Sequence, residues 1–194
     1  MPDAALLAAA LIALAAGFAA GSFWSRRRQR HELARLREEL RKAVDEARMD
    51  PLTGIGNRKA FDERLQFLAA LHQRYGAPFS VVLLDVDDLK GVNDRGGHAA
   101  GDALLCRLAA ALRASIRESD LAARIGGDEF ALLLPQTPLE GAQTVLARIT
   151  ERQEAASPIA MSAGIASILR DETPDTLLRR ADEALYAEKS RSRP

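Results

Sequence analysis

The chain has 194 residues, enough for one domain of ordinary size plus an appendage. Lysine and arginine number 27, and so do aspartate and glutamate; a neutral chain gives no argument for a nucleic-acid partner. A single cysteine, Cys106, excludes an intramolecular disulfide, and the sequence contains no Cys/His cluster that would suggest zinc.

The first apolar stretch, residues 4–24, contains no charged side chain. As a helix it would span about 31 Å, close to the hydrocarbon thickness of a membrane. Arginines follow at 26, 27, 28 and 30, whereas only Asp3 is charged before it. The positive-inside rule then predicts a transmembrane helix with the rest of the chain in the cytoplasm. The alternative is a cleaved signal peptide, which would need a basic segment at its start.

Residues 25–49 change in character and become strongly charged. Leucine and alanine recur there at spacings of 3 and 4, which is the heptad pattern of a short coiled coil. A membrane anchor would raise the effective concentration of two such chains. The alternative is a monomeric amphipathic helix that lies on anionic lipid. The repeating positions are Leu33, Leu36, Leu40, Ala43 and Ala47.

A proline and two glycines after Asp50 interrupt the helix, and residues 58–75 are expected to form the next one. Residues 79–87 are nearly all aliphatic until they end in acids, which predicts a buried central strand. Carboxylates at the carboxyl end of such a strand are where α/β sheets carry ligand chemistry. The alternative role for one such aspartate is a helix N-cap. The acids are Asp85, Asp87 and Asp88.

The runs Leu121–Ile125 and Phe130–Leu134 predict a β-hairpin with Gly126-Gly127-Asp128-Glu129 at its tip. The glycines would allow positive φ and close approach of a ligand to the backbone. Adjacent carboxylates repel unless a cation is near. Together with Asp85 and Asp87, the tip therefore predicts a divalent metal site, and its oxygen-only ligands favour magnesium, with manganese as the alternative.

The remaining residues alternate between helical and extended patterns. Helices are expected at 101–116, 139–154 and 176–190, and a strand at 158–167 with a kink near Gly164. Strands alternating with helices, plus one hairpin, predict an α/β domain over residues 50–194, with a mixed central sheet flanked by helices.

Six short motifs follow one another between Asp50 and Arg193. They are Asp50-x-Leu52-Thr53-Gly54-x-x-Asn57-Arg58, Asp85-Val86-Asp87-x-Leu89-Lys90-x-Val92-Asn93-Asp94, Gly97-His98-x-x-Gly101-Asp102, Arg124-x-Gly126-Gly127-Asp128-Glu129-Phe130, Ser162-x-Gly164, and Ala181-Asp182-x-Ala184-Leu185-Tyr186-x-x-Lys189. In this order they resemble one known family, the GGDEF-domain diguanylate cyclases. The chain departs from that family at Leu89, Glu188 and Ser192, where phenylalanine, alanine and glycine are usual.

The resemblance implies that two GTP molecules are joined into cyclic di-GMP with release of two pyrophosphates. It implies metal ligation by Asp85, the Val86 carbonyl and Asp128, and catalytic roles for Asp128, Glu129 and Lys90. The other substrate-binding positions that it implies are Asn93, His98 and Asp102 for guanine, Gly126 and Gly127 for close approach of the nucleotide, and Lys189 and Arg193 for phosphate.

Regulation and dimerisation are implied by the same resemblance. Arg117 and Asp120 match an inhibitory product site, to which Arg148 could add a contact. Each subunit of a homodimer would bring one GTP. The transmembrane helix predicted above, and not the resemblance, places the chain in the bacterial inner membrane as a single-pass protein with the domain in the cytoplasm. The alternatives are a catalytically idle cyclic di-GMP receptor, against which the intact Gly126–Phe130 motif argues, and another magnesium-dependent nucleotidyl transferase.

Overall fold

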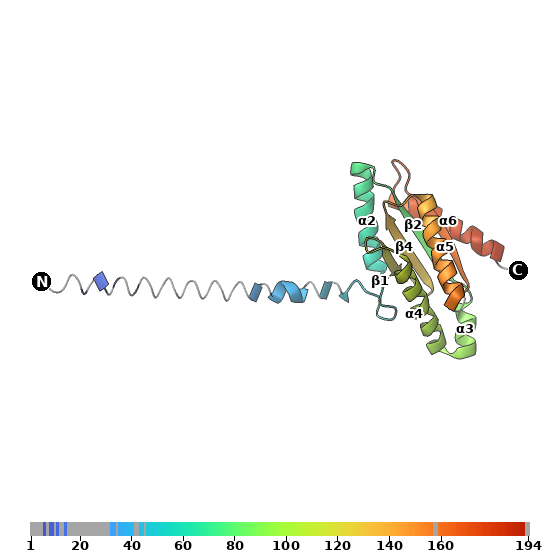
Figure 1. The fold of residues 1–194 in the computed structure, drawn as a ribbon, viewed down its shortest axis with the longest axis horizontal. Helices are drawn as coiled ribbons and strands as arrows, with labels where there is room; N and C mark the ends of the chain where they lie inside the picture. Colours follow the sequence, from blue (N-terminus) through green and yellow to red (C-terminus); the bar gives the residue numbers. More distant parts are fainter. Residues whose placement is uncertain are drawn as a thin grey trace. The chain divides into compact units, whose positions relative to one another are not determined.

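The computed structural model describes residues 46–156 and 159–192 without a break. Ahead of these ranges it describes positions 6, 8, 9, 11, 14, 32, 33, 35–40, 43 and 44. The chain divides into two units, Met1–Ala47 and Arg48–Pro194. All the helices and strands labelled in Figure 1 belong to the second unit.

The described residues of the first unit before position 47 are helical. Leu33, Leu36 and Leu40 are each more than half exposed, as a seam without its partner would be, so the coiled coil stays a prediction. No helix among the described residues is both long and apolar enough to cross a membrane. Residues 4–24 and the arginines after them lie mostly outside the described positions, and the transmembrane helix also stays a prediction.

One five-stranded sheet, in the order β1-β3-β4-β2-β5, organises the second unit. β1 pairs with β3 in parallel, and the other neighbours are antiparallel, which confirms the predicted mixed sheet. β2 lies between β4 and β5, as its continuous aliphatic sequence predicted. The strands are β1 Gly56–Asn57, β2 Phe79–Val86, β3 Leu121–Arg124, β4 Glu129–Pro135 and β5 Met161–Ser167.

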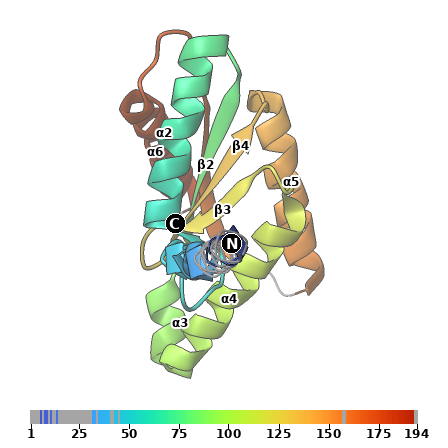
Figure 2. The ribbon, with the colours of Figure 1, turned by 90° about the vertical axis from the view of Figure 1, so that its left-hand side faces the viewer.

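Helices cover both faces of the sheet (Figure 2). α2 (Arg58–Tyr75) and α6 (Pro174–Ser192) pack on one face, and α4 (His98–Ser115) and α5 (Leu139–Ala156) on the other. Side chains alternate along β2, so that Val81 joins the α2/α6 core while Val82 and Leu84 join the α4/α5 core. This alternation decides which helix each residue at the end of β2 faces.

A short helix, α3 (Leu89–Gly96), was not predicted, and α4 begins at His98 instead of near Gly101. Asp88 adopts a left-handed conformation (φ 53°), and its carboxylate caps α3 by accepting a hydrogen bond from Gly91 N at 3.1 Å. Gly97, at φ 75°, turns the chain into α4. In this segment Asp88 therefore forms a helix cap and Gly97 a turn.

β5 begins at Met161, three residues later than predicted, and its ladder with β2 continues through Gly164 without the expected kink. The glycine instead permits close packing of α6. A Cβ added there would lie 2.0 Å from Ala181 O and 2.4 Å from Leu185 N. α6 therefore rests directly on β5.

Candidate functional site

The predicted acidic site lies at the end of β2. Asp85 follows the alternation of the strand and faces α6, and its side chain is buried with 8% of the residue exposed. Lys189 Nζ, on α6, lies 2.7 Å from Asp85 Oδ1. A buried carboxylate requires a compensating cation or donors, and here Lys189 provides the cation. Two residues from distant parts of the sequence thus meet at one point.

The tip of the β3–β4 hairpin joins the same strand end. Val86 N donates to Asp128 O at 3.1 Å, and Asp85 pairs with Glu129 across the two strands. Opposite residues of an antiparallel pair carry their side chains on the same face. The register therefore brings the predicted metal-binding and catalytic residues of β2 and β4 together.

The candidate metal ligands are all oxygen atoms, namely the carboxylates of Asp85 and Asp128 and the carbonyl of Val86. Among the described residues, no group of three or more His, Cys, Asp or Glu side chains is arranged to hold a metal ion. Two carboxylates and one carbonyl suit magnesium or manganese that arrives with phosphate oxygens as its other ligands. The donor set fits such an ion, and its identity stays a prediction.

The two other acids after β2 have structural partners. Asp87 accepts from Ser162 Oγ on β5, at 3.1 Å to Oδ1 and 3.3 Å to Oδ2. Asp88 caps α3 and also contacts Arg95 at 3.3 Å. Asp87 was predicted to join Asp85 in the metal site, but its carboxylate is bonded to the neighbouring strand. The Ser162-x-Gly164 motif was the only sequence signal for this contact.

The predicted guanine-binding residues gather where α3 meets α4. Asn93, on α3, lies against Gly101 of α4, where an added Cβ would be 2.1 Å from Asn93 Oδ1. This oxygen is buried and has no hydrogen-bond partner among the described residues. His98 and Asp102 are exposed in the first two turns of α4. The three residues thus share one junction, which the motif spacing alone did not reveal.

The two glycines at the hairpin tip have different environments. A Cβ added at Gly126 would lie 2.3 Å from Glu129 Oε2, so a side chain at this position would displace the Glu129 carboxylate. A Cβ at Gly127 would meet nothing within 4 Å. Neither glycine has positive φ, contrary to expectation. Gly127 is the open backbone position that a ligand could approach.

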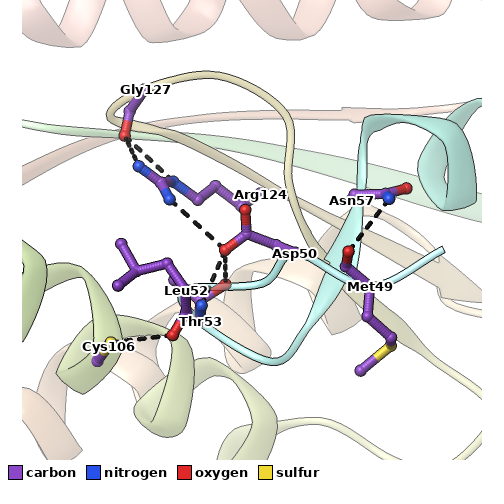
Figure 3. A network of polar contacts seen from close by, with 8 residues as sticks. All are labelled: Met49, Asp50, Leu52, Thr53, Asn57, Cys106, Arg124 and Gly127. Atoms are coloured by element: carbon purple, nitrogen blue, oxygen red, sulfur yellow. Dashed lines mark hydrogen bonds and ion pairs between the residues drawn. The ribbon is translucent and has the colours of Figure 1, made fainter. Parts of the chain in front are cut away.

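A polar network holds the hairpin tip to the first turn of the domain (Figure 3). Arg124 donates to Gly127 O from Nη2 at 2.7 Å and from Nε at 3.2 Å, and its Nη1 lies 3.5 Å from Asp50 Oδ1. Asp50 Oδ1 also accepts from Thr53 N at 2.8 Å and Thr53 Oγ1 at 2.5 Å. Both ends of this contact lay in recognised motifs, but the sequence did not indicate that they meet.

Asp50 is ionised in this network. Burial raises the pKa of its carboxyl group, but the hydrogen bonds from Thr53 and the positive charge of Arg124 outweigh that effect. The pKa of Asp50 therefore lies below its usual value of 3.8. The carboxylate remains available to orient the Arg124 guanidinium across the whole neutral range.

The predicted product site forms a compact turn after α4. Asp120 Oδ2 accepts from Arg117 N at 2.8 Å, and Arg148 on α5 donates to Ser115 O at the end of α4. Arg148 is thereby brought to the same corner as the turn. A hollow of about 460 Å³ beside it is lined in part by Asp120, Arg64 and Phe67. The structure thus gathers the three predicted residues at one corner.

The two remaining phosphate-binding candidates are less defined. Lys90 is exposed in the first turn of α3, next to the end of β2. Arg193 lies outside the described residues. The basic residue that the structure does bring to Asp85 is Lys189.

Comparison with known proteins gives a consistent match to this domain. A family model described as "Diguanylate cyclase, GGDEF domain" matches residues 47–194. Diguanylate cyclase DgcP of Pseudomonas aeruginosa is 40% identical over 153 residues, covering 74% of this chain and 23% of DgcP. Diguanylate cyclase DgcM of Escherichia coli K12 is 36% identical over 167 residues, covering 84% of this chain and 40% of DgcM. The chain spans well under half the length of these relatives.

A solved structure agrees in fold as well as in sequence. The coiled coil and GGDEF domain of DgcB from Caulobacter crescentus, crystallised in complex with c-di-GMP, superposes with a TM-score of 0.78 at 33% identity. The match covers 84% of this chain and 91% of that one.

Proposed function

Because residues 47–194 make this chain a member of the GGDEF family of diguanylate cyclase domains, we propose that it condenses two GTP molecules into cyclic di-GMP and two pyrophosphates. The observation that carries the proposal is the β2–β4 register. It joins Asp85 and Val86 to Asp128 and Glu129, with Lys189 at the same point. An acidic strand end beside a lysine suits a metal-bound triphosphate.

The reaction transfers a guanylyl group. The 3′-oxygen of one GTP forms a bond to the α-phosphorus of the other, while the bond to the leaving pyrophosphate breaks; a second such transfer closes the ring. Magnesium or manganese held by Asp85, Asp128 and the Val86 carbonyl would supply positive charge to the triphosphate and lower the pKa of the attacking hydroxyl. Asp128 is the candidate base for the hydroxyl proton, and Glu129 supports it.

Other side chains would bind and orient the nucleotide. Lys90 on α3 and Lys189 on α6 are suited to bind phosphate, because each carries an ammonium group and lies near the end of β2. Asn93, His98 and Asp102 are suited to the guanine edge, since a carboxylate can accept from both N1–H and the N2 amino group. Adenine offers no such pair of donors, which is why we propose GTP as the substrate.

Two subunits are needed, since one site holds one of the two reactants. We propose that the helical segment 25–49 pairs two chains and that residues 4–24 anchor them in the bacterial inner membrane, with the domain on the cytoplasmic side. We also propose that cyclic di-GMP inhibits the enzyme by binding at Arg117 and Asp120, with Arg148 nearby. A receptor without activity is the alternative, against which the intact hairpin tip argues.

The test is incubation of the purified full chain, in detergent, with GTP and magnesium, followed by chromatography of cyclic di-GMP. Asp128→Ala should abolish product while the fold survives, as circular dichroism would record. Asp62→Ala, an exposed position on α2, is the matched control and should retain activity. Unchanged turnover in Asp128→Ala would refute the site assignment, and binding of cyclic di-GMP without turnover in the wild type would favour the receptor.

A further inference from the structure

We infer that Glu188 is a positioning residue that fastens the end of α6 to β5 and thereby sets where Lys189 meets the site. The inference rests on the proposed function, in which Lys189 contacts the triphosphate. It concerns a residue at which this chain departs from the alanine usual in its family. Three contacts between α6 and the two strands beneath it support this role.

The first contact gives a hydrogen-bond acceptor, the Glu188 carboxylate, to a backbone N–H of the edge strand β5. β5 is the edge of the sheet, and Asp87 N donates to Ala160 O, which sets the alternation of hydrogen bonds between β2 and β5. By that alternation Ala163 N points away from β2. Ala163 is buried at 9% exposure, so its N–H needs an acceptor. Glu188 Oε2 accepts from Ala163 N at 2.9 Å.

The second contact fixes the helix on the strand. Gly164 follows Ala163, and the backbone of α6 at Ala181 and Leu185 occupies the space where a Cβ of Gly164 would lie. Ala181, Leu185 and Glu188 are spaced at i, i+4 and i+7, so they share one face of α6. The same face is therefore attached to β5 at two levels, by close packing and then by the Glu188 hydrogen bond.

The third contact joins Lys189 to Asp85, and the first two contacts hold the helix turn that carries Lys189. Lys189 follows Glu188 and lies one turn beyond Leu185, and its Nζ lies 2.7 Å from Asp85 Oδ1. α6 ends at Ser192, so Lys189 lies in its last turn, and terminal turns of helices fray. A lysine on a flexible stem and a fraying turn would sample many positions. The Glu188 bond to β5 restrains that turn beside Asp85.

The experiment uses the full chain in detergent and measures the affinity for a non-hydrolysable GTP analogue with magnesium by calorimetry, together with KM and kcat for GTP. Glu188→Ala should weaken analogue binding and raise KM about fivefold, the size expected for one lost restraining hydrogen bond, with kcat little changed. Hydrogen exchange at the Ala163 amide should become faster in the same variant.

Two further variants separate positioning from other roles. Glu188→Gln keeps an acceptor for Ala163 N but removes the charge, so its affinity for the analogue should be close to that of the wild type. If Glu188→Ala and Glu188→Gln both bound the analogue more tightly than the wild type, the charge of Glu188 would repel the triphosphate, and the inference would be overturned. In a Lys189→Met background, Glu188→Ala should have no further effect on the affinity. An equal loss in that background would also overturn it. Glu183→Ala, at another exposed glutamate of α6, is the control.

The outcomes also distinguish this inference from the proposed function. A wild-type chain that binds the analogue but makes no cyclic di-GMP overturns the proposed reaction, while the Glu188 comparison can still be made by calorimetry. An active wild type whose affinity is unchanged by Glu188→Ala overturns the inference alone. A wild type that does not bind the analogue overturns both.

Discussion

The contact of Asn93 with Gly101 illustrates how one missing side chain can control another residue's position. A helical glycine costs about 1 kcal/mol relative to alanine. α4 nevertheless has a glycine at position 101, where Asn93 Oδ1 occupies the space that a Cβ would fill. Among the residues that the structure describes, this buried oxygen has no hydrogen-bond partner, so its packing against Gly101 is what positions the carboxamide.

We predict opposite effects of Gly101→Ala on stability in two backgrounds. In the wild type the new methyl group should push the Asn93 carboxamide aside, lower the unfolding temperature and reduce the preference for GTP over ITP, which lacks the N2 amino group. In an Asn93→Ala background it should raise the unfolding temperature, because only the gain in helix propensity remains. Thermal unfolding measures the stability of each variant, and kinetics with GTP and with ITP measure the substrate preference. A Gly101→Ala single variant that is more stable than the wild type would show that the new methyl group does not clash with Asn93.

At the scale of elements, the carboxylate of Glu172 holds together the loop that connects β5 to α6. Glu172 Oε1 accepts from Arg180 Nε at 2.7 Å, and its Oε2 accepts from Arg180 Nη2 at 2.7 Å and from Leu169 N at 2.8 Å. Arg180 also donates to Ser167 O at the end of β5. The pKa of Glu172 lies below its usual 4.5, mainly because its carboxylate accepts hydrogen bonds from Arg180. Burial of the carboxyl group acts in the opposite direction but is outweighed.

A carboxyl group with a lowered pKa stabilises the folded state above its unfolded pKa, and this contribution is lost as the pH falls. We therefore predict that Glu172→Gln lowers the unfolding temperature at pH 7 by roughly 2–4 °C. The difference from the wild type should shrink as the pH falls below about 4.5, the ordinary pKa of the group. A gap that stayed constant with pH would show that the charge of Glu172 is not responsible.

Elements with a strong local pattern were predictable, and contacts between them were not. The aliphatic run of β2 and the paired runs around Gly126 each encode their own structure, and both were confirmed. α3 was missed because its eight residues are mostly polar or glycine and bury no residue fully. The Lys189–Asp85 and Glu188–Ala163 contacts join α6 to strands far away in sequence, and no local pattern records which turn of a helix lies over which strand.

For the whole molecule, the proposed reaction makes the rate depend on how often two domains meet. Exposed Leu36 and Leu40 lie on the described helical residues of the first unit. We predict that Leu36→Asp with Leu40→Asp shifts the full chain toward monomer in sedimentation experiments and lowers cyclic di-GMP production about tenfold, as expected for buried charge at a coiled-coil seam. Activity should recover at higher protein concentration.

The control for this prediction is Arg35→Asp, which introduces the same residue type on the outer face of the predicted coiled coil, at an exposed position away from the seam. It should change neither association nor turnover. Equal activity of the double variant and the wild type at low concentration would mean that the domains pair without the helical segment.

The Asp50 network determines where the second unit can be joined to other sequences. Asn57 N donates to Arg48 O at 2.8 Å, Asp50 N donates to Ile55 O at 2.8 Å, and Asp50 contacts Arg124. The first three residues of the second unit are therefore already bonded into its folded structure. A chimaera with its junction before Arg48 keeps the whole network, whereas a junction after Asp50 removes the carboxylate partner of Arg124 and leaves only its bonds to Gly127 O. The second unit therefore carries its own boundary at Arg48, where another sequence can be joined without loss of these contacts.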